Sequence, residues 1–265
     1  MATSSDMEVL RDAALEMASA AGNAILPHFR RALAIENKAE TGFDPVTEAD
    51  RAAEAAIRHI IRHRFPGDGI IGEEYGDERT DAERIWVLDP IDGTRAFVLG
   101  LPVWATLIGV IEAGRPLFGL MHQPFVGETF MGWGEHALIR RGGTETALRA
   151  RPCAALSDAT LATTTPAMFS GDERTAYDRV EAAAKTVRYG TDCYAYALLA
   201  AGLNDLVIES GLQPYDVVAL IPIVRGAGGE IASWDGGAPD AGGRIVAAGD
   251  ARILDAARTI LQNSA

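Results

Sequence analysis

The sequence predicts a layered fold of mixed helices and strands, of the α/β or α+β class. Several segments place apolar residues at helical spacing, and short apolar runs rich in β-branched residues lie between them. Strand and helix do not alternate strictly, which argues against a purely parallel sheet. With 265 residues, 48% of them hydrophobic, the chain is long enough to bury a sizeable core.

The first two predicted elements are amphipathic helices. Ser5 and Glu8 form a capping-box pattern ahead of apolar residues at helical spacing. Thr47, with Asp50 three residues later, marks the start of a second helix, which ends at Pro66-Gly67. We therefore expect one helix to follow Ser5 and another to follow Thr47.

Short apolar runs after the second helix predict strands. Residues 70–71 and 85–88 are each followed by acidic residues, as expected where a buried strand reaches its carboxyl end. Two β-rich runs within residues 103–121 flank a turn at residues 112–115 that contains Gly114. This pattern predicts an antiparallel hairpin.

A boundary is predicted at residues 140–152, where Gly142-Gly143 and several charges interrupt the apolar runs. We expect two domains, residues 1–148 and residues 149–265. The elements expected after the boundary are a strand near Leu161, a helix at about 172–185, a strand at 186–189, a helix through 196–200, a strand at 206–208, a helix at 217–224 opened by Asp216, a strand at 244–248 and a terminal helix.

The net charge excludes some partners. The chain has 37 acidic and 24 basic residues, a formal net charge of −13, which repels nucleic acid and anionic membrane surfaces. No basic patch is visible, and no apolar run reaches the roughly 20 residues of a membrane span. We therefore expect neither nucleic acid nor membrane as a partner. A protein this acidic needs metal cations to handle a small anionic substrate.

The cysteines and the N-terminus predict the compartment. Cys153 and Cys193 have no metal or redox spacing, so we expect reduced, buried thiols. The N-terminal residues are acidic where a secretory signal is basic. A cytoplasmic location is the expectation.

The chemistry is concentrated in two acidic blocks, residues 72–74 (GEE) and residues 86–94 (WVLDPIDGT). Several carboxylates brought into one small space would repel and raise one another's pKa values. Mg²⁺ resolves that conflict, because it binds oxygen ligands, and two such ions about 3.5–4 Å apart can clamp a phosphoryl displacement. Glu73 or Glu74 alone would suit a solvated loop, but the nine-residue block is too specific for that.

With these blocks the sequence resembles the inositol monophosphatase family of Mg²⁺-dependent, lithium-sensitive phosphatases. The resemblance covers nearly the whole chain. It rests on residues 44–50 (DPVTEAD), 72–74, 89–94, 215–219 (YDVVA) and 226–229 (GAGG). It implies an αβαβα sandwich of the inositol monophosphatase and fructose-bisphosphatase type, and a homodimer.

The resemblance also implies a metal site. Glu73, Asp89 and the carbonyl of Ile91 would hold one Mg²⁺. Asp89, Asp92 and Asp216 would hold a second, and a third could bind weakly beside Glu73. Two or three ions per active site are expected.

The catalytic residues implied by the family are Thr94, Asp50 and Glu73. Thr94 paired with Asp50 would orient and deprotonate a metal-bound water. The backbone N–H groups of Gly93 and Thr94 would bind the phosphate, as a helix start or turn can do without a basic side chain. The expected substrate contacts are Gly93, Thr94, Asp192, Glu209 and Asp216.

Two departures from inositol-specific members bear on the substrate. Residues 188–196 (RYGTDCYAY) replace a stretch of small residues, and Tyr215 stands where the family usually has tryptophan. This pattern is similar to the histidinol-phosphate phosphatases of the family. L-Histidinol phosphate carries an ammonium and an imidazole, with which Asp192 and Glu209 could pair. Asp192 has an equally weighted alternative role as the N-cap of the following helix.

The resemblance therefore implies a small-molecule phosphate ester as partner, and Mg²⁺-dependent hydrolysis of L-histidinol phosphate to L-histidinol and phosphate, a step of histidine biosynthesis. The alternatives are an inositol-1-phosphate phosphatase, a broad sugar or nucleotide phosphatase, and a non-catalytic binding homologue. Retention of all the motif residues argues against the last alternative. Those residues are Glu73, Asp89, Asp92, Thr94 and Asp216.

Overall fold

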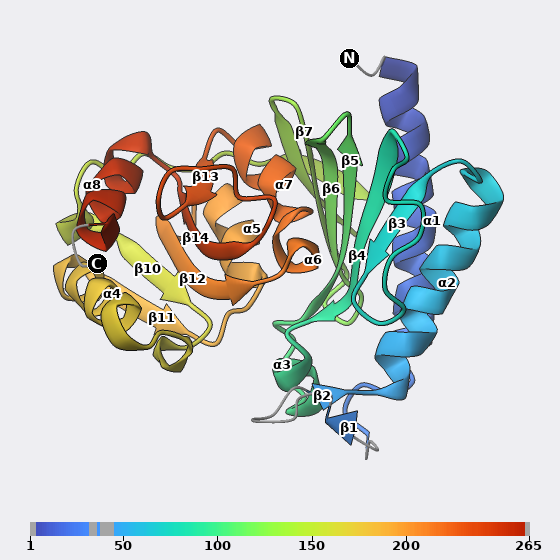
Figure 1. The fold of residues 1–265 in the computed structure, drawn as a ribbon, viewed down its shortest axis with the longest axis horizontal. Coiled ribbons are helices and arrows are strands. Elements are labelled where there is room, and N and C mark those ends of the chain that lie inside the picture. The colour runs from blue at the N-terminus through green and yellow to red at the C-terminus, as the bar shows by residue number, and fades with distance from the viewer. Residues whose placement is uncertain (1–3, 32–35, 38–44, 263–265) are drawn as a thin grey trace.

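The computed structural model describes residues 4–31, 36–37 and 45–262. Two sheets and the helices around them form five layers in the order helix, sheet, helix, sheet, helix (Figure 1). The predicted αβαβα architecture is confirmed. Asp44, the first residue of the 44–50 motif, lies outside the described residues.

The first layer consists of α1 (Ser4–Ile25) and α2 (Glu48–Arg64), which pack against each other and cover one face of the first sheet (Figure 1). The predicted cap of α2 is present: Thr47 Oγ1 accepts the Ala49 N–H at 3.1 Å, and the Asp50 carboxylate accepts the Thr47 N–H at 2.8 Å. Ser5 lies inside α1 rather than ahead of it. Residues 36–37 and 45–46 pair as the short strands β1 (Glu36–Asn37) and β2 (Pro45–Val46).

The first sheet has seven strands in chain order. They are β3 (Gly69–Gly72), β4 (Arg84–Asp92), β5 (Ala105–Glu112), β6 (Arg115–Gln123), β7 (Glu128–Trp133), β8 (His136–Arg141) and β9 (Thr144–Ala147). β3 and β4 are parallel and every later neighbour is antiparallel, so the predicted β5–β6 hairpin is confirmed. The short helix α3 (Thr94–Val98) follows β4 directly.

The segment at residues 140–152 contains a strand that the sequence analysis did not predict, β9. Its first part belongs to the β8–β9 hairpin, whose turn is made by Gly142 and Gly143, both with positive φ. All four residues of β9 are exposed, so the apolar alternation that marks a strand is missing there.

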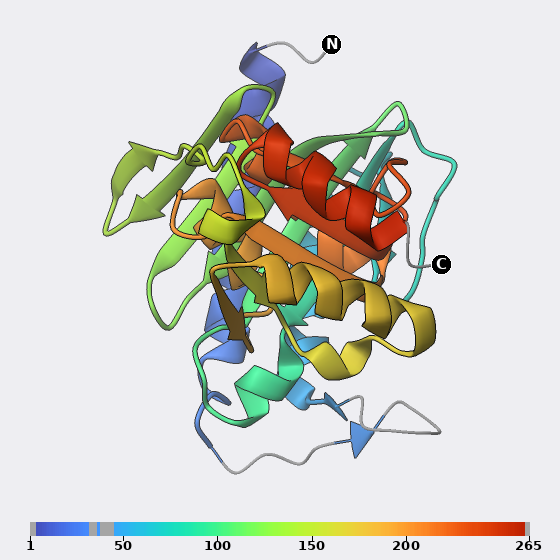
Figure 2. The ribbon, with the colours of Figure 1, turned by 90° about the vertical axis from the view of Figure 1, so that its left-hand side faces the viewer.

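The second sheet has five strands in the order β11-β10-β12-β14-β13. Their bounds are Thr160–Thr163 (β10), Thr186–Tyr189 (β11), Leu206–Leu212 (β12), Glu230–Ser233 (β13) and Gly243–Ala248 (β14). Helices α4 (Gly171–Ala183) and α8 (Ala251–Gln262) lie side by side on its outer face (Figure 2). The 3₁₀ turns η1 (Leu156–Asp158) and η2 (Pro166–Met168) complete this part.

The middle layer consists of α5 (Tyr194–Ala200), α6 (Pro214–Val217) and α7 (Leu220–Gly226). The single helix predicted at 217–224 is wrong: Pro214 starts α6 earlier, and a turn separates it from α7. Glycines on the first sheet let these helices approach, because a Cβ on Gly119 would overlap the Ala219 carbonyl oxygen. This approach brings Asp216 of α6 to the end of β4.

Two further findings bear on the protein's surroundings. Among the helices of the described ranges, none combines the length and apolarity needed to cross a membrane. Cys153 and Cys193 are both buried and free, as expected.

Candidate active site

Three aspartates meet where the first sheet touches the middle layer. Asp89 and Asp92 lie near the end of β4, and Asp216 lies in α6; each offers a carboxylate oxygen within 4.8 Å of the others. Residues three apart in a regular strand point to opposite faces. The register of β4 against β5 shifts between Asp89 and Asp92, and this irregularity lets both carboxylates reach one site.

Glu73 joins this cluster through the pairing of β3 with β4. The two strands are parallel, so their carboxyl ends meet at one edge of the sheet, and the Glu73 N–H donates to the Leu88 carbonyl at 3.3 Å. The Glu73 carboxylate lies close enough to raise the pKa of Asp89 by both its charge and a hydrogen bond. The four predicted carboxylates are therefore brought together.

The environment of the cluster fits a divalent cation. Asp89 is 2% exposed, and burial, followed by the charges of Glu73, Asp92 and Asp216, raises its pKa well above the usual range. Burial and the charge of Asp216 do the same for Asp92. Within the described residues the buried Asp89 Oδ1 accepts no hydrogen bond. Buried carboxylate oxygens that repel one another and lack donors are suitable ligands for Mg²⁺.

The proposed proton-transfer residues lie at two element starts. The Thr94 hydroxyl donates to the Ile91 carbonyl at 3.0 Å, in the turn that connects β4 to α3. Asp50 is 1% exposed and accepts the Thr47 hydroxyl at 2.6 Å, so the α2 cap fixes its position. The pairing of Asp50 with Thr94 stays a prediction.

A profile of the inositol monophosphatase family matches residues 6–263. The chain belongs to this family. It is 44% identical over 236 residues to the bifunctional phosphatase IMPL2 of Arabidopsis thaliana, covering 88% of this chain and 67% of that protein. It is 37% identical over 212 residues to the histidinol-phosphatase of Mycobacterium tuberculosis, covering 77% and 79%. The structure of an inositol monophosphatase from Zymomonas mobilis superimposes with a TM-score of 0.84 at 40% identity, covering 95% and 98%.

Two adjoining cavities open beside the aspartate cluster. The larger, of about 430 Å³, is lined by Gly93, Thr94, Arg95, Thr164, Thr165, Ala167, Met168 and Asp192. The smaller, of about 150 Å³, shares Thr164, Met168 and Asp192 with it and is also lined by Asp92, Cys193, Tyr196, Glu209, Leu212, Asp216 and Leu220. Every predicted substrate contact therefore lines one of the two cavities.

Asp192 connects the two cavities. The structure puts Cys193, not Asp192, at the N-cap of α5, so the capping alternative for Asp192 is wrong. Asp192 has a φ of 44°, in the left-handed region, and its side chain lies beside Gly93. Burial raises the Asp192 pKa to about 6, and the charge of Arg95 opposes that rise.

Glu209 has an unsatisfied oxygen at the same site. It is 2% exposed, and its Oε1 accepts the Thr164 N–H at 2.7 Å. Its Oε2 is buried and has no hydrogen-bond partner in the part of the chain that the structure describes. Burial raises the Glu209 pKa to about 8. A cationic donor in the smaller cavity would satisfy this oxygen and favour the ionised carboxylate.

The structure places at the site two residues to which the sequence analysis gave no individual role. The Tyr196 hydroxyl is buried without a hydrogen-bond partner among the described residues, and it lines the smaller cavity. Arg95 lines the larger cavity beside the phosphate-binding residues expected from the family. In the sequence, Tyr196 lies in an apolar helical segment and cannot be told apart from a core residue. Arg95 directly follows Thr94 of the DPIDGT motif, and this position could have indicated that Arg95 lies at the site.

A buried ion pair holds the turn that carries Glu73. Glu54 and Arg58 of α2 are 0% and 2% exposed, and Arg58 Nε donates to Glu54 at 2.7 Å. The Glu54 carboxylate also accepts the N–H groups of Glu74 at 2.8 Å and Tyr75 at 3.2 Å. A Cβ on Gly72 would overlap Glu54 Oε1 and the Arg58 guanidinium, so a larger residue there would have to displace this ion pair. In the sequence this pair has only the spacing of a surface i,i+4 pair.

Proposed function

We propose that the chain is a Mg²⁺-dependent phosphomonoesterase that hydrolyses L-histidinol phosphate to L-histidinol and phosphate. The family supports phosphate-ester hydrolysis. The observation that favours this substrate is a pair of carboxylates on the cavities beside the aspartate cluster, the partly buried Asp192 and the buried Glu209. The ammonium and imidazole of histidinol phosphate can donate charged hydrogen bonds to them, whereas an uncharged polyol would gain less. The similarity to a histidinol-phosphatase supports the same reading.

The metal would be held by the carboxylates of Glu73, Asp89, Asp92 and Asp216 and by the carbonyl of Ile91. When bound, Mg²⁺ supplies Lewis-acid polarisation of the phosphate and makes water more acidic. A binding site for two or three ions remains part of the proposal. Without cations, four clustered carboxylates would repel the phosphate group.

The remaining residues bind substrate and move protons. Gly93 and Thr94 would donate backbone N–H groups to the phosphate oxygens. Thr94 and Asp50 would accept the proton of the attacking water, whose oxygen bonds to phosphorus as the ester P–O bond breaks. The departing alkoxide takes up a proton to become the alcohol of L-histidinol. The proposed reaction therefore consumes one water and needs no covalent enzyme intermediate.

Substitution of Asp192 tests the substrate assignment. Asp192→Asn removes one negative charge with little change of volume, and we expect KM for histidinol phosphate to rise about tenfold or more, since a charged hydrogen bond contributes roughly 1.5–3 kcal/mol. KM for inositol 1-phosphate, which has no ammonium, should change far less. Equal increases for both substrates would contradict the proposed ion pair.

The main alternative is an inositol-1-phosphate or broad-specificity phosphatase. The structural similarity to an inositol monophosphatase at 40% identity favours it. The same pair of substrates separates the two, because that enzyme would prefer the neutral inositol ester. A non-catalytic homologue would release phosphate from neither.

We also propose a cytoplasmic homodimer. Exposed apolar side chains on the segment after α3 and on the β6–β7 turn support an interface: Leu99 is 74% exposed, Leu101 51% and Phe125 47%. Arg30 links these segments, since its Nε donates to the Gly100 carbonyl at 3.0 Å and its guanidinium lies 4.6 Å from the Phe125 ring centroid. Leu99→Asp should convert a dimer to a monomer in analytical ultracentrifugation, and a wild-type monomer would refute the assembly.

A further inference from the structure

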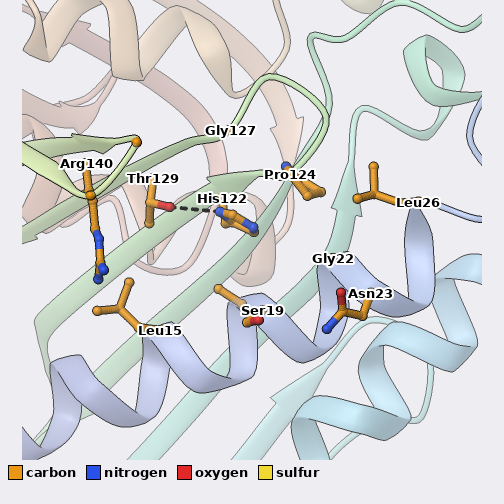
Figure 3. A pocket seen from close by; sticks show the side chains of 13 residues that line it. Leu15, Ser19, Gly22, Asn23, Leu26, His122, Pro124, Gly127, Thr129 and Arg140 are labelled. Carbon is orange, nitrogen blue, oxygen red and sulfur yellow. Dashed lines mark hydrogen bonds between the residues drawn. The ribbon is translucent and has the colours of Figure 1, made fainter.

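A separate cavity lies on the face of the first sheet that α1 covers. Its volume is about 360 Å³, and it lies between α1 and the strands β6, β7 and β8 (Figure 3). Leu15, Ser19 and Asn23 face it from α1, with His122 and Arg140 on the opposite side. It shares no lining residue with either cavity of the candidate active site. This size is typical of pockets for small metabolites.

A row of polar side chains crosses the sheet to this cavity. The register pairs Thr106 with His122, His122 with Thr129, and Thr129 with Arg140. Directly paired residues place their side chains on the same face of a sheet. The first three residues of the row form hydrogen bonds. Thr106 donates to the Pro90 carbonyl at 2.8 Å, and His122 Nδ1 lies 2.9 Å from Thr129 Oγ1.

Arg140 lies where the row reaches the cavity, and the register pairs it directly with Glu145 of β9, whose carboxylate forms an ion pair with Arg11 of α1. No hydrogen bond or ion pair connects the Arg140 guanidinium to any described residue, although it is only partly exposed. The nearby Arg141, in contrast, pairs with Glu128. The protein has 37 acidic residues, and none of those that the structure describes lines the cavity. Burial lowers the pKa of His122 to about 4, so Arg140 is the cavity's positive charge at neutral pH.

We propose that this cavity binds a small metabolite carrying one phosphate or carboxylate group. Arg140 is the ion-pair partner of that group. Ser19, Asn23 and His122 offer hydrogen-bonding groups to a polar body, and Leu15 supplies an apolar wall. A half-buried guanidinium favours such oxyanions because its N–H groups can donate to two oxygens at once. This site is independent of the proposed hydrolysis.

Calorimetry on the full chain in EDTA tests the proposal. Without metal, the carboxylates of the aspartate cluster repel an anion. Arg95 lines the larger active-site cavity, so the variants described below assign any binding to the separate cavity. The probes are glycerol 3-phosphate and glycerate, which carry a phosphate and a carboxylate on related three-carbon frameworks, with glycerol as the uncharged control. We expect at least one anion to bind the wild type and glycerol not to bind. Which anion binds assigns the phosphate or the carboxylate class.

Two variants probe different properties of the cavity. Arg140→Gln removes the charge, and Ser19→Leu fills space without changing charge; each should weaken binding at least about tenfold. Arg149→Gln makes the same charge change at an exposed residue outside the cavity and should bind like wild type. The proposal is overturned if neither anion binds wild type, if folded Arg140→Gln and Ser19→Leu bind unchanged, or if Arg149→Gln loses binding equally.

Discussion

Replacing Glu54 by Gln perturbs the support of the Glu73 turn while keeping side-chain shape. The carboxylate accepts three N–H groups, from Arg58 at 2.7 Å, Glu74 at 2.8 Å and Tyr75 at 3.2 Å. Gln offers one acceptor oxygen and one NH₂ group, so at least one of these donors then faces another donor. The substitution also removes the negative charge beside the buried Arg58.

The expected cost follows from these contacts. Removing one partner of a buried ion pair costs roughly 3–5 kcal/mol. Arg58 keeps a second partner, because its Nη1 donates to Glu78 at 2.8 Å, which favours the lower end of that range. We expect Glu54→Gln to lower the free energy of unfolding by about 3 kcal/mol. The double variant Glu54→Gln/Arg58→Met should lose less than the sum of the single variants, by about 2 kcal/mol, since no buried charge is left unpaired.

Urea unfolding of metal-free protein at pH 7.5, followed by fluorescence and circular dichroism, measures these values. The control is Asp178→Asn, which breaks an i,i+4 pair of the same kind whose partners Arg174 and Asp178 are 45% and 47% exposed. Its expected cost is below about 0.5 kcal/mol. Glu54→Gln should also weaken Mg²⁺ binding in calorimetry, and the control should not. A cost for Glu54→Gln no larger than that of the control would refute the reasoning.

Three further predictions concern pH and packing. Burial would raise the pKa of Asp205, but hydrogen bonds from Arg151 and the Thr160 N–H outweigh it and lower the pKa. In urea titrations, Asp205→Asn should therefore cost about 2 kcal/mol at pH 7, and less as the pH falls below the usual range of Asp pKa values. Ionisation of Glu209 has the opposite effect on stability, because its raised pKa means that the folded state disfavours the charged form. Metal-free Glu209→Gln should therefore be more stable than wild type by on the order of 1–3 kcal/mol at pH 9, and about as stable near pH 5. Gly119→Ala should lower the midpoint of thermal unfolding by at least about 5 °C, because its Cβ would overlap the Ala219 carbonyl; an unchanged midpoint would contradict the close approach of sheet and helix.

The sequence carried much of the fold because its signals were local. The Thr47–Asp50 cap, the hairpin turn near Gly114 and the acids that end β3 and β4 follow from short-range patterns. The strand β9 was missed because it is exposed on both faces. The division at residue 148 stays a prediction, and one apolar cluster of the middle layer contacts both sheets.

The sequence predicted only those parts of the site that lie in short, specific motifs. Acids at strand ends indicated the cluster, and the structure adds the α6 position that brings Asp216 to it. Long-range contacts left no sequence signal. Glu54 and Arg58 have the i,i+4 spacing of a surface ion pair. Arg140 lies beside Thr129 only because of the register between β7 and β8. Such residues depend on tertiary neighbours, which periodicity does not contain.

The central claim is metal-dependent hydrolysis of a cationic phosphate ester. Phosphate release from L-histidinol phosphate and from inositol 1-phosphate, measured side by side with Mg²⁺ and with EDTA, tests it most directly. The proposed function predicts release that requires Mg²⁺ and strongly prefers L-histidinol phosphate. Equal rates on both esters, or a preference for inositol 1-phosphate, would contradict the role of Asp192 and Glu209, and release that persists in EDTA would contradict the metal site.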